Sequence, residues 1–207
     1  MTHSASPEPV VYIVDDDPDV CAALGLLLEA EGHAVRTFDS AVSFLEAYED
    51  RWTGCLVLDV RMPGMSGLEL QYELRRRGMT MPIIFLTGHG DVPMASRAFR
   101  SGALDFIEKP FRDDILLERI DDALERAATD RAARDSVSLE RACYERLTPR
   151  EKEVFALVVA GRSNKEIARS LGVSHRTIDV HRARVMEKLG VHSLAELVIK
   201  AARYGVE

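Results

Sequence analysis

The sequence predicts an α/β domain built on a five-stranded parallel sheet, followed by a smaller all-α domain. Short apolar runs alternate with amphipathic stretches through residues 1–128, and this alternation is typical of strand–helix repeats. The last 60 residues instead carry closely spaced helix start and stop signals. A length of 207 residues suits two domains of about 125 and 65 residues.

Five apolar runs are the expected strands, and several are continuous β-branched or leucine runs, as in strands buried on both faces of a parallel sheet. They are Val10–Val14, Ala34–Phe38, Cys55–Leu58, Ile83–Leu86 and Asp105–Ile107. Between them, Val20, Leu24 and Leu28 form a helical stripe, and Ser66 with Glu69 forms a capping box. Short connections make such a sheet right-handed and doubly wound, a flavodoxin-like arrangement that binds ligands outside its carboxyl strand ends.

Residues 112–147 contain neither Gly nor Pro, and their first part keeps a helical stripe. We therefore expect the last helix of the α/β domain to continue into a helical linker that ends near Ala142. A flexible linker is the alternative, but Gly/Ser enrichment is missing. The expected domains are residues 9–128 and 144–207, joined by the linker at 129–143.

Four helices are expected in the all-α domain, at about 149–160, 164–171, 174–189 and 193–204. Thr148, Ser163 and Ser193 each stand three residues before a Glu, which is the spacing of a capping box, and Ser174 is a further cap. Gly161 and Gly190 lie where helices end. The segment 167–174 has the helix–glycine turn–helix form of a helix-turn-helix, whose second helix enters the major groove of DNA.

Charge separates the two halves of the chain. The whole sequence has a net charge of -7, yet residues 145–207 hold 12 Lys and Arg against 8 Asp and Glu. The first half is therefore acidic and the second basic, which suits a nucleic-acid partner for the second. No apolar run approaches the ~20 residues of a membrane span and no signal pattern opens the chain, so we expect a cytoplasmic protein without a membrane partner. The three scattered cysteines indicate neither a disulfide nor a metal framework.

Chemically active side chains follow the strands at their carboxyl ends. They are Asp15, Asp16 and Asp17 after the first strand, Asp59 after the third, Thr87 after the fourth and Lys109 after the fifth. Clustered carboxylates repel one another unless a cation compensates, and oxygen ligands suit Mg²⁺. Asp59 stands single at its strand end, so it is the candidate nucleophile for an aspartyl phosphate, with Lys109 and Thr87 contacting the phosphoryl group. Taken alone, the three consecutive Asp residues would more often be a solvated turn and helix cap.

Four blocks of sequence resemble the signatures of two-component response-regulator receivers, and residues 87–95 are most similar to the FixJ subgroup. The blocks are Val11–Asp17, Leu58–Gly64, Thr87–Gly90 and Phe106–Phe111. The resemblance implies that a sensor histidine kinase phosphorylates Asp59, that Thr87 and Phe106 move together as a switch, and that a cis peptide precedes Pro110. It also implies that Mg²⁺ is held by Asp15, Asp16, Asp59 and the main-chain carbonyl of Arg61. We further hypothesise that Arg61 and His89 tune the access of hydrolytic water.

The C-terminal segment resembles the LuxR/FixJ/NarL output domain through residues 147–151, 164–168, 177–181 and 188–189. The resemblance implies phosphate contacts by Lys165, Thr177 and Arg184. It implies base contacts by Val180 with its neighbours Arg176 and Asp179, although Asp179 is equally able to repel wrong sites. His181 and Lys188 complete the polar face of this expected recognition helix.

We therefore expect a transcription regulator rather than an enzyme, in which phosphate on Asp59 promotes homodimerisation and binding to double-stranded promoter DNA. RNA polymerase is a further candidate partner. A constitutive DNA binder with a purely structural receiver is one alternative, and the complete set of receiver residues argues against it. A phosphatase of the aspartyl-phosphate type is another, and the missing second catalytic acid near Asp59 and the output domain argue against that.

Overall fold

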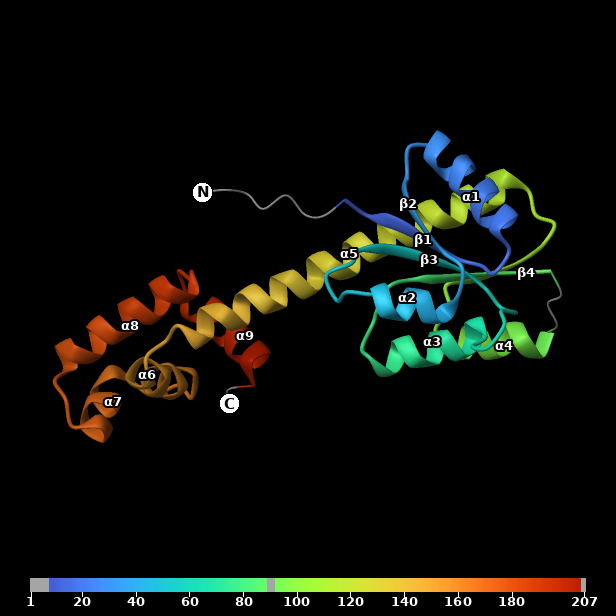
Figure 1. Ribbon diagram of the computed structural model, residues 1–207. Helices are drawn as coiled ribbons and strands as arrows, with labels where there is room; N and C mark the ends of the chain where they lie inside the picture. Colours follow the sequence, from blue (N-terminus) through green and yellow to red (C-terminus); the bar gives the residue numbers. More distant parts are fainter. Residues whose placement is uncertain (1–7, 89–91, 206–207) are drawn as a thin grey trace. The chain divides into compact units, whose positions relative to one another are not determined.

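The computed structural model describes residues 8–88 and 92–205. The chain divides into two compact units, Met1–Arg131 and Ala132–Glu207, here called the N-terminal and C-terminal units. Helix α5 (Asp113–Glu145) is one continuous element that supplies residues to both units, and it ends three residues beyond the expected position near Ala142 (Figure 1). No helix in the described ranges is long and apolar enough to cross a membrane.

The N-terminal unit contains the predicted parallel sheet, with strand order β2-β1-β3-β4-β5 and every pairing parallel. This is the order of the flavodoxin-like doubly wound fold, so the predicted fold class is confirmed. The strands are β1 (Val10–Val14), β2 (Ala34–Phe38), β3 (Gly54–Asp59), β4 (Ile83–Thr87) and β5 (Asp105–Glu108). Strands β3 and β4 run one residue further than expected, so Asp59 and Thr87 are their last residues.

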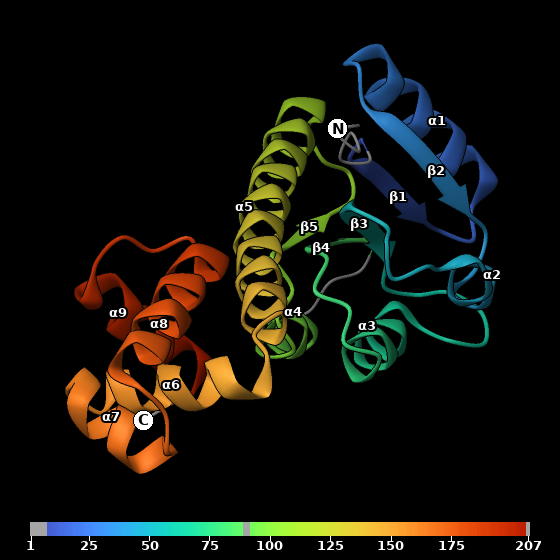
Figure 2. The same cartoon turned by 90° about the vertical axis from the view of Figure 1, so that its left-hand side faces the viewer.

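Helices cover both faces of this sheet (Figure 2). One face packs against α1 (Pro18–Ala30) and the start of α5, through Leu24, Leu28, Leu116 and Ile120. The other packs against α2 (Ala41–Ala47), α3 (Gly67–Arg76) and α4 (Val92–Arg100), through Phe44, Leu70, Leu74 and Ala98. Strands β1, β3 and β4 are therefore buried on both sides, and polar side chains are left to the strand ends.

The C-terminal unit is all-α, as predicted, with helices α6 (Pro149–Val159), α7 (Asn164–Leu171), α8 (His175–Leu189) and α9 (Leu194–Tyr204). The capping boxes at Thr148 and Ser163 are complete. The box expected at Ser193 is only half formed, because Glu196 accepts from the main-chain N–H of His192 at 2.9 Å instead. Gly172 joins α7 to α8 with a φ of 66°, a conformation that favours glycine.

Candidate phosphoacceptor site and nucleic-acid interface

The carboxyl edge of the sheet gathers the predicted active side chains of the N-terminal unit. Asp15 directly follows β1, Asp59 ends β3, Thr87 ends β4 and Lys109 directly follows β5. Asp15 is 3% exposed, Asp59 8% and Thr87 1%, so these polar groups are largely withdrawn from water. A parallel sheet brings them together because all its carboxyl ends lie at one edge.

Lys109 bridges the two buried carboxylates. Its Nζ donates to Asp15 Oδ2 at 2.7 Å and to Asp59 Oδ1 at 3.1 Å. The second oxygen of Asp59 accepts from the main-chain N–H of Arg61 at 2.6 Å. The main-chain N–H of Lys109 bonds the carbonyl of Thr87 at 2.7 Å, and the Lys109–Pro110 peptide is cis, as the resemblance implies. The main chain of Lys109 is thus fixed to the end of β4, and its ammonium is held by the two carboxylates.

The electrostatics of this cluster favour an additional cation. Burial raises the pKa of the Asp59 carboxyl above its ordinary value, although hydrogen bonds from Lys109 and Arg61 act in the opposite direction. Burial also opposes the charge of Lys109, but hydrogen bonds to Asp15 and Asp59 outweigh it and raise the pKa of the ammonium. One lysine therefore faces two carboxylates in a poorly hydrated place. Because both are hard oxygen donors with excess negative charge, the residues fit Mg²⁺.

The three consecutive aspartates have separate surroundings. Asp15 lies in the buried cluster, whereas Asp16 is exposed at the same edge. Asp17 caps α1 by accepting from the N–H groups of Asp19 and Val20. Within the described ranges, no group of three or more His, Cys, Asp or Glu side chains is arranged to hold a metal. The Mg²⁺ ligand set of Asp15, Asp16, Asp59 and the main-chain carbonyl of Arg61 therefore stays a prediction.

Gly67 is a positioning residue that sequence reasoning missed. A side chain added there would place its Cβ 2.1 Å from the main-chain oxygen of Asp59, far inside van der Waals contact. The Gly67 N–H also donates to the carbonyl of Val60 at 3.0 Å. The first residue of α3 thus fits against the end of β3 and fixes the backbone that carries Asp59. The sequence signal was a glycine directly after the Ser66 cap, where helices have no need of one.

A cavity of about 830 Å³ lies beside this cluster, between α3 and α4. Asp16 and Arg61 line it together with Met62, Tyr72 and Met94. The side chain of Phe106 is partly buried and packs near Phe85, with ring centroids 6.2 Å apart. The proposed tuning of hydrolysis stays a prediction, since His89 lies outside the described residues.

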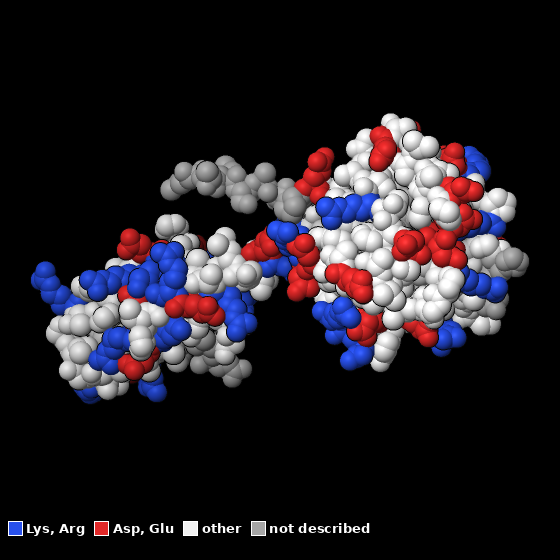
Figure 3. Space-filling view, viewed as in Figure 1, with Lys and Arg blue, Asp and Glu red and all other residues white. Residues whose placement is uncertain are grey.

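The C-terminal unit presents α8 as its basic surface. Lys and Arg side chains gather over this helix in Figure 3. Arg176, Asp179 and Arg184 are exposed along α8, as is Val180 at 44%, and Lys165 is exposed near the start of α7. The opposite side of α8 is buried through Ile178, Val185 and Leu189. The helix therefore has one packed face and one face free for DNA, as a recognition helix requires.

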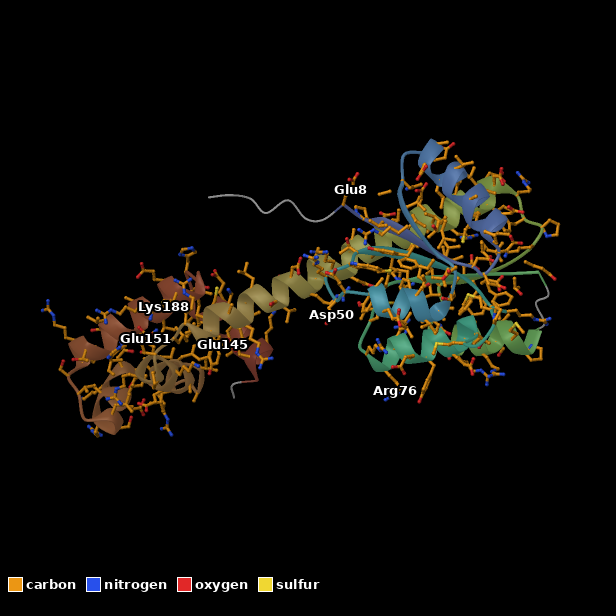
Figure 4. The ribbon with its side chains drawn as sticks, in the orientation of Figure 1. Glu8, Asp50, Arg76, Glu145, Glu151 and Lys188 are labelled. Carbon is orange, nitrogen blue, oxygen red and sulfur yellow. The ribbon has the colours of Figure 1, made fainter. Side chains whose placement is uncertain are left out.

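Four of the expected DNA-binding side chains have partners or surroundings inside the protein, and one of them is Asp179, which accepts from Asn164 Nδ2 at 2.7 Å. Thr177 Oγ1 bonds the Ser174 hydroxyl at 2.8 Å as part of the helix cap. His181 is partly buried, and its Nδ1 has no hydrogen-bond partner among the described atoms. Lys188 donates to the buried Glu151 carboxylate at 2.6 Å, and the two side chains lie side by side in Figure 4. Lys188 thus joins α8 to the start of α6, which sequence reasoning did not anticipate.

A phosphoacceptor-type pocket and a helix-turn-helix in one chain define a class of signalling protein. In this class the chemistry of one domain controls DNA binding by the other. The comparisons with known proteins agree. The family model for the response regulator receiver domain matches residues 11–121, and that for luxR-family bacterial regulatory proteins matches residues 145–201.

Relatives match almost the whole chain. Identity is 44% over 196 residues to the response regulator protein TmoT of Ectopseudomonas mendocina, covering 95% of this chain and 89% of TmoT. It is 45% over 195 residues to the transcriptional regulatory protein FixJ of Rhizobium meliloti (strain 1021), covering 94% and 96%. The solved structure of the response regulator StyR matches with a TM-score of 0.89 at 45% identity, covering 95% of this chain and all of that one.

The chain therefore belongs to the response regulators that combine a receiver domain with a luxR-type DNA-binding domain. It is a phosphorylation-dependent transcription regulator of a two-component system. Proteins of this family are transcriptional regulators rather than enzymes. The receiver implies a sensor kinase as partner, and the luxR-type domain implies DNA.

Proposed function

We propose that Asp59 is the phosphoacceptor and that its phosphorylation by a sensor histidine kinase promotes homodimerisation and promoter binding. The observation that carries this proposal is the Lys109 ammonium bridging Asp15 and Asp59 at the carboxyl edge of the sheet. Of the two bridged carboxylates, Asp59 ends the central strand β3, beside the cavity that Arg61 lines. In this proposal the protein regulates transcription and does not turn over a separate substrate.

The phosphoryl transfer needs a positioned nucleophile and charge neutralisation more than covalent help from the protein. An Asp59 oxygen attacks phosphorus, and the bond from phosphorus to the donor breaks as the new P–O bond forms. Lys109 stays beside Asp59 and faces the added negative charge. The hydroxyl of Thr87, at the end of the neighbouring strand β4, is the proposed donor to a phosphoryl oxygen.

Mg²⁺ is the proposed cofactor, and when bound it supplies the remaining positive charge needed to stabilise the phosphoryl oxygens. Asp15, Asp59 and the main-chain carbonyl of Arg61 would hold it. Asp16 is exposed at the same edge and is the further proposed ligand, directly or through water.

The proposed switch is a population shift between two forms of the receiver. Thr87 moves toward the phosphoryl group, Phe106 turns inward, and the surface of α4 and β5 becomes competent to pair with a second copy. Two recognition helices are then presented to successive turns of the major groove. Lys165 and Arg184 bind phosphates there, together with Thr177, while Arg176 and Val180 read bases. RNA polymerase is a further proposed partner at the promoter.

The test compares wild-type protein with Asp59→Asn, each with and without acetyl phosphate and Mg²⁺. Light scattering after size exclusion gives the oligomeric state, and fluorescence anisotropy gives affinity for duplexes enriched from a random library. We expect the wild type alone to become dimeric and to bind at least tenfold more tightly, a gain of about 1.4 kcal/mol. Equal dimerisation and binding in all four samples would instead favour a constitutive DNA binder with a structural receiver.

A further inference from the structure

Asp179 lies in a chain of hydrogen bonds that joins α7 to α8. Its Oδ1 accepts from Asn164 Nδ2 at 2.7 Å, and its Oδ2 lies 3.1 Å from His175 Nδ1. The other end of the Asn164 amide, Oδ1, accepts from Arg182 at 2.5 Å. We call these four residues the α7–α8 clip. Both carboxylate oxygens of Asp179 and both ends of the Asn164 amide have partners within it.

The clip connects the start of one helix to the first turns of the next. Asn164 is the first residue of α7, whereas His175, Asp179 and Arg182 follow one another along α8 at intervals of four and three residues. The apolar contacts between the helices involve Ile167 and Ile178, and such contacts are not directional. Paired hydrogen bonds are directional, so the clip constrains how α8 is rotated about its axis.

A carboxylate on the DNA-facing side of α8 otherwise has an electrostatic cost. Asp179 is exposed between Arg176 and Val180 in sequence, and negative charge there opposes attraction to DNA phosphates. An isolated surface ion pair with His175 would contribute little. The clip differs because Asn164 and Arg182 are partly buried and every member is connected. Its structural role offers a reason for an acidic residue at this position.

We propose that Asp179 is a positioning residue for DNA sequence recognition rather than a base-reading one. Through Asn164 it fixes the rotation of α8, and that rotation presents Arg176 and Val180 to the base edges. The inference rests on the proposed DNA-binding function of α8. It extends that function by assigning Asn164, His175 and Arg182 to a framework that shapes specificity from within the protein.

An exchange of the two central groups tests the clip. Asn164→Asp alone sets two carboxylates face to face. In Asn164→Asp/Asp179→Asn the positions of the amide and the carboxylate are exchanged, so the hydrogen bond between them is restored, and Arg182 keeps an oxygen acceptor at position 164 throughout. An acid at the start of α7 suits the helix dipole, so the single variant is not weakened through the helix itself. Glu187→Gln is the matched control, because it removes the same charge as Asp179→Asn from α8 outside the clip.

The first readout is thermal unfolding of the full chain, monitored by far-UV circular dichroism. We expect Asn164→Asp to lower the midpoint of the C-terminal unit and the double variant to recover it. Additive effects of the two substitutions on the thermal midpoint would show that Asn164 and Asp179 are not coupled, which would overturn the proposal. This measurement involves no DNA, so it decides the clip separately from the proposed function.

The second readout is the sequence enriched from a random duplex library by the acetyl-phosphate-treated protein, with the affinity ratio of enriched to random duplex. We expect Asn164→Asp to lose about tenfold in this ratio, the scale of one charged hydrogen bond. The double variant and Glu187→Gln should enrich the wild-type sequence. Asp179→Asn should do so too, because the amide oxygen of the new side chain still accepts from Asn164 Nδ2. A base preference that changes in Asp179→Asn and stays changed in the double variant would show that Asp179 reads the base. Failure of the wild type to enrich any sequence would count against the proposed function instead.

Discussion

Gly67→Ala tests how the end of β3 is positioned. The added methyl group would lie 2.1 Å from the main-chain oxygen of Asp59 and 3.0 Å from Leu58 Cγ, whereas ordinary contact begins at 3.4 Å. Relief requires the strand end or the start of α3 to move by more than 1 Å, because the nearest atom belongs to the backbone. Overpacking of this kind costs about 1–3 kcal/mol, and the rigid contact places Gly67→Ala toward the upper end.

Gly25→Ala is the matched control within the same unit. Gly25 lies inside α1, and a methyl group there meets nothing within 4 Å. Replacement of a helical glycine by alanine should stabilise the unit by about 0.5–1 kcal/mol. The same chemical change is thus expected to act with opposite sign at two positions of one domain.

The assay uses Trp52, the single tryptophan of the chain, which lies in the N-terminal unit. Urea unfolding followed by its fluorescence reports that unit, and a shifted midpoint at constant slope gives the change in free energy of unfolding. Since a displacement of 1 Å is able to cost about a hundredfold in rate, phosphorylation of Gly67→Ala by acetyl phosphate should slow at least tenfold. Wild-type stability and a wild-type phosphorylation rate in Gly67→Ala would refute the reasoning.

Three further predictions concern charge. Burial raises the pKa of the Asp59 carboxyl, so ionisation of this carboxyl opposes folding, and stability is lost as pH rises through the raised pKa. Without metal, Asp59→Asn should therefore raise the urea midpoint at about pH 7 and much less at about pH 4. Burial opposes the charge of Glu151, but hydrogen bonds from Lys188 and Thr148 outweigh it and hold its pKa below the ordinary value, so its contribution is present above that value and lost as pH falls through the lowered one. Glu151→Gln should therefore lower the thermal midpoint of the C-terminal unit at about pH 7 and lose this effect in acid, and a loss that is equal at both pH values would contradict the ion pair. Arg184→Ala should reduce the slope of log affinity for DNA against log salt concentration by about one, whereas Lys188→Ala should leave this slope unchanged. An equal reduction in both variants would show that Lys188 contacts DNA phosphates.

The strands and their chemistry were predictable from the sequence for a physical reason. Strands buried on both faces need continuous apolar runs, and in a parallel sheet the residues that follow them converge at one edge. The same rule predicts that Asp15, Asp59, Thr87 and Lys109 lie close together. The helix starts at Thr148, Ser163 and Ser174 were equally readable, because caps act through neighbouring residues alone.

The features that escaped prediction depend on tertiary geometry. The bounds of α2 and α4 were not assigned from the sequence, because helices of seven and nine residues make only about two turns and offer few positions to establish a period. Lys188 and Glu151 are 37 residues apart, and only the crossing of α8 over α6 makes them partners. The contact of Asp179 with Asn164 likewise depends on how α7 meets α8. Side chains that looked available for DNA were therefore indistinguishable in sequence from those held inside the domain.

The most direct test of the central claim is the intact mass of the protein after incubation with acetyl phosphate and Mg²⁺, measured for wild type beside Asp59→Asn. We predict one added phosphoryl group on the wild type and none on the variant. A phosphoryl group on both proteins would contradict the assignment of Asp59 as the acceptor. No addition to either, even with a sensor kinase as donor, would contradict phosphorylation as the switch.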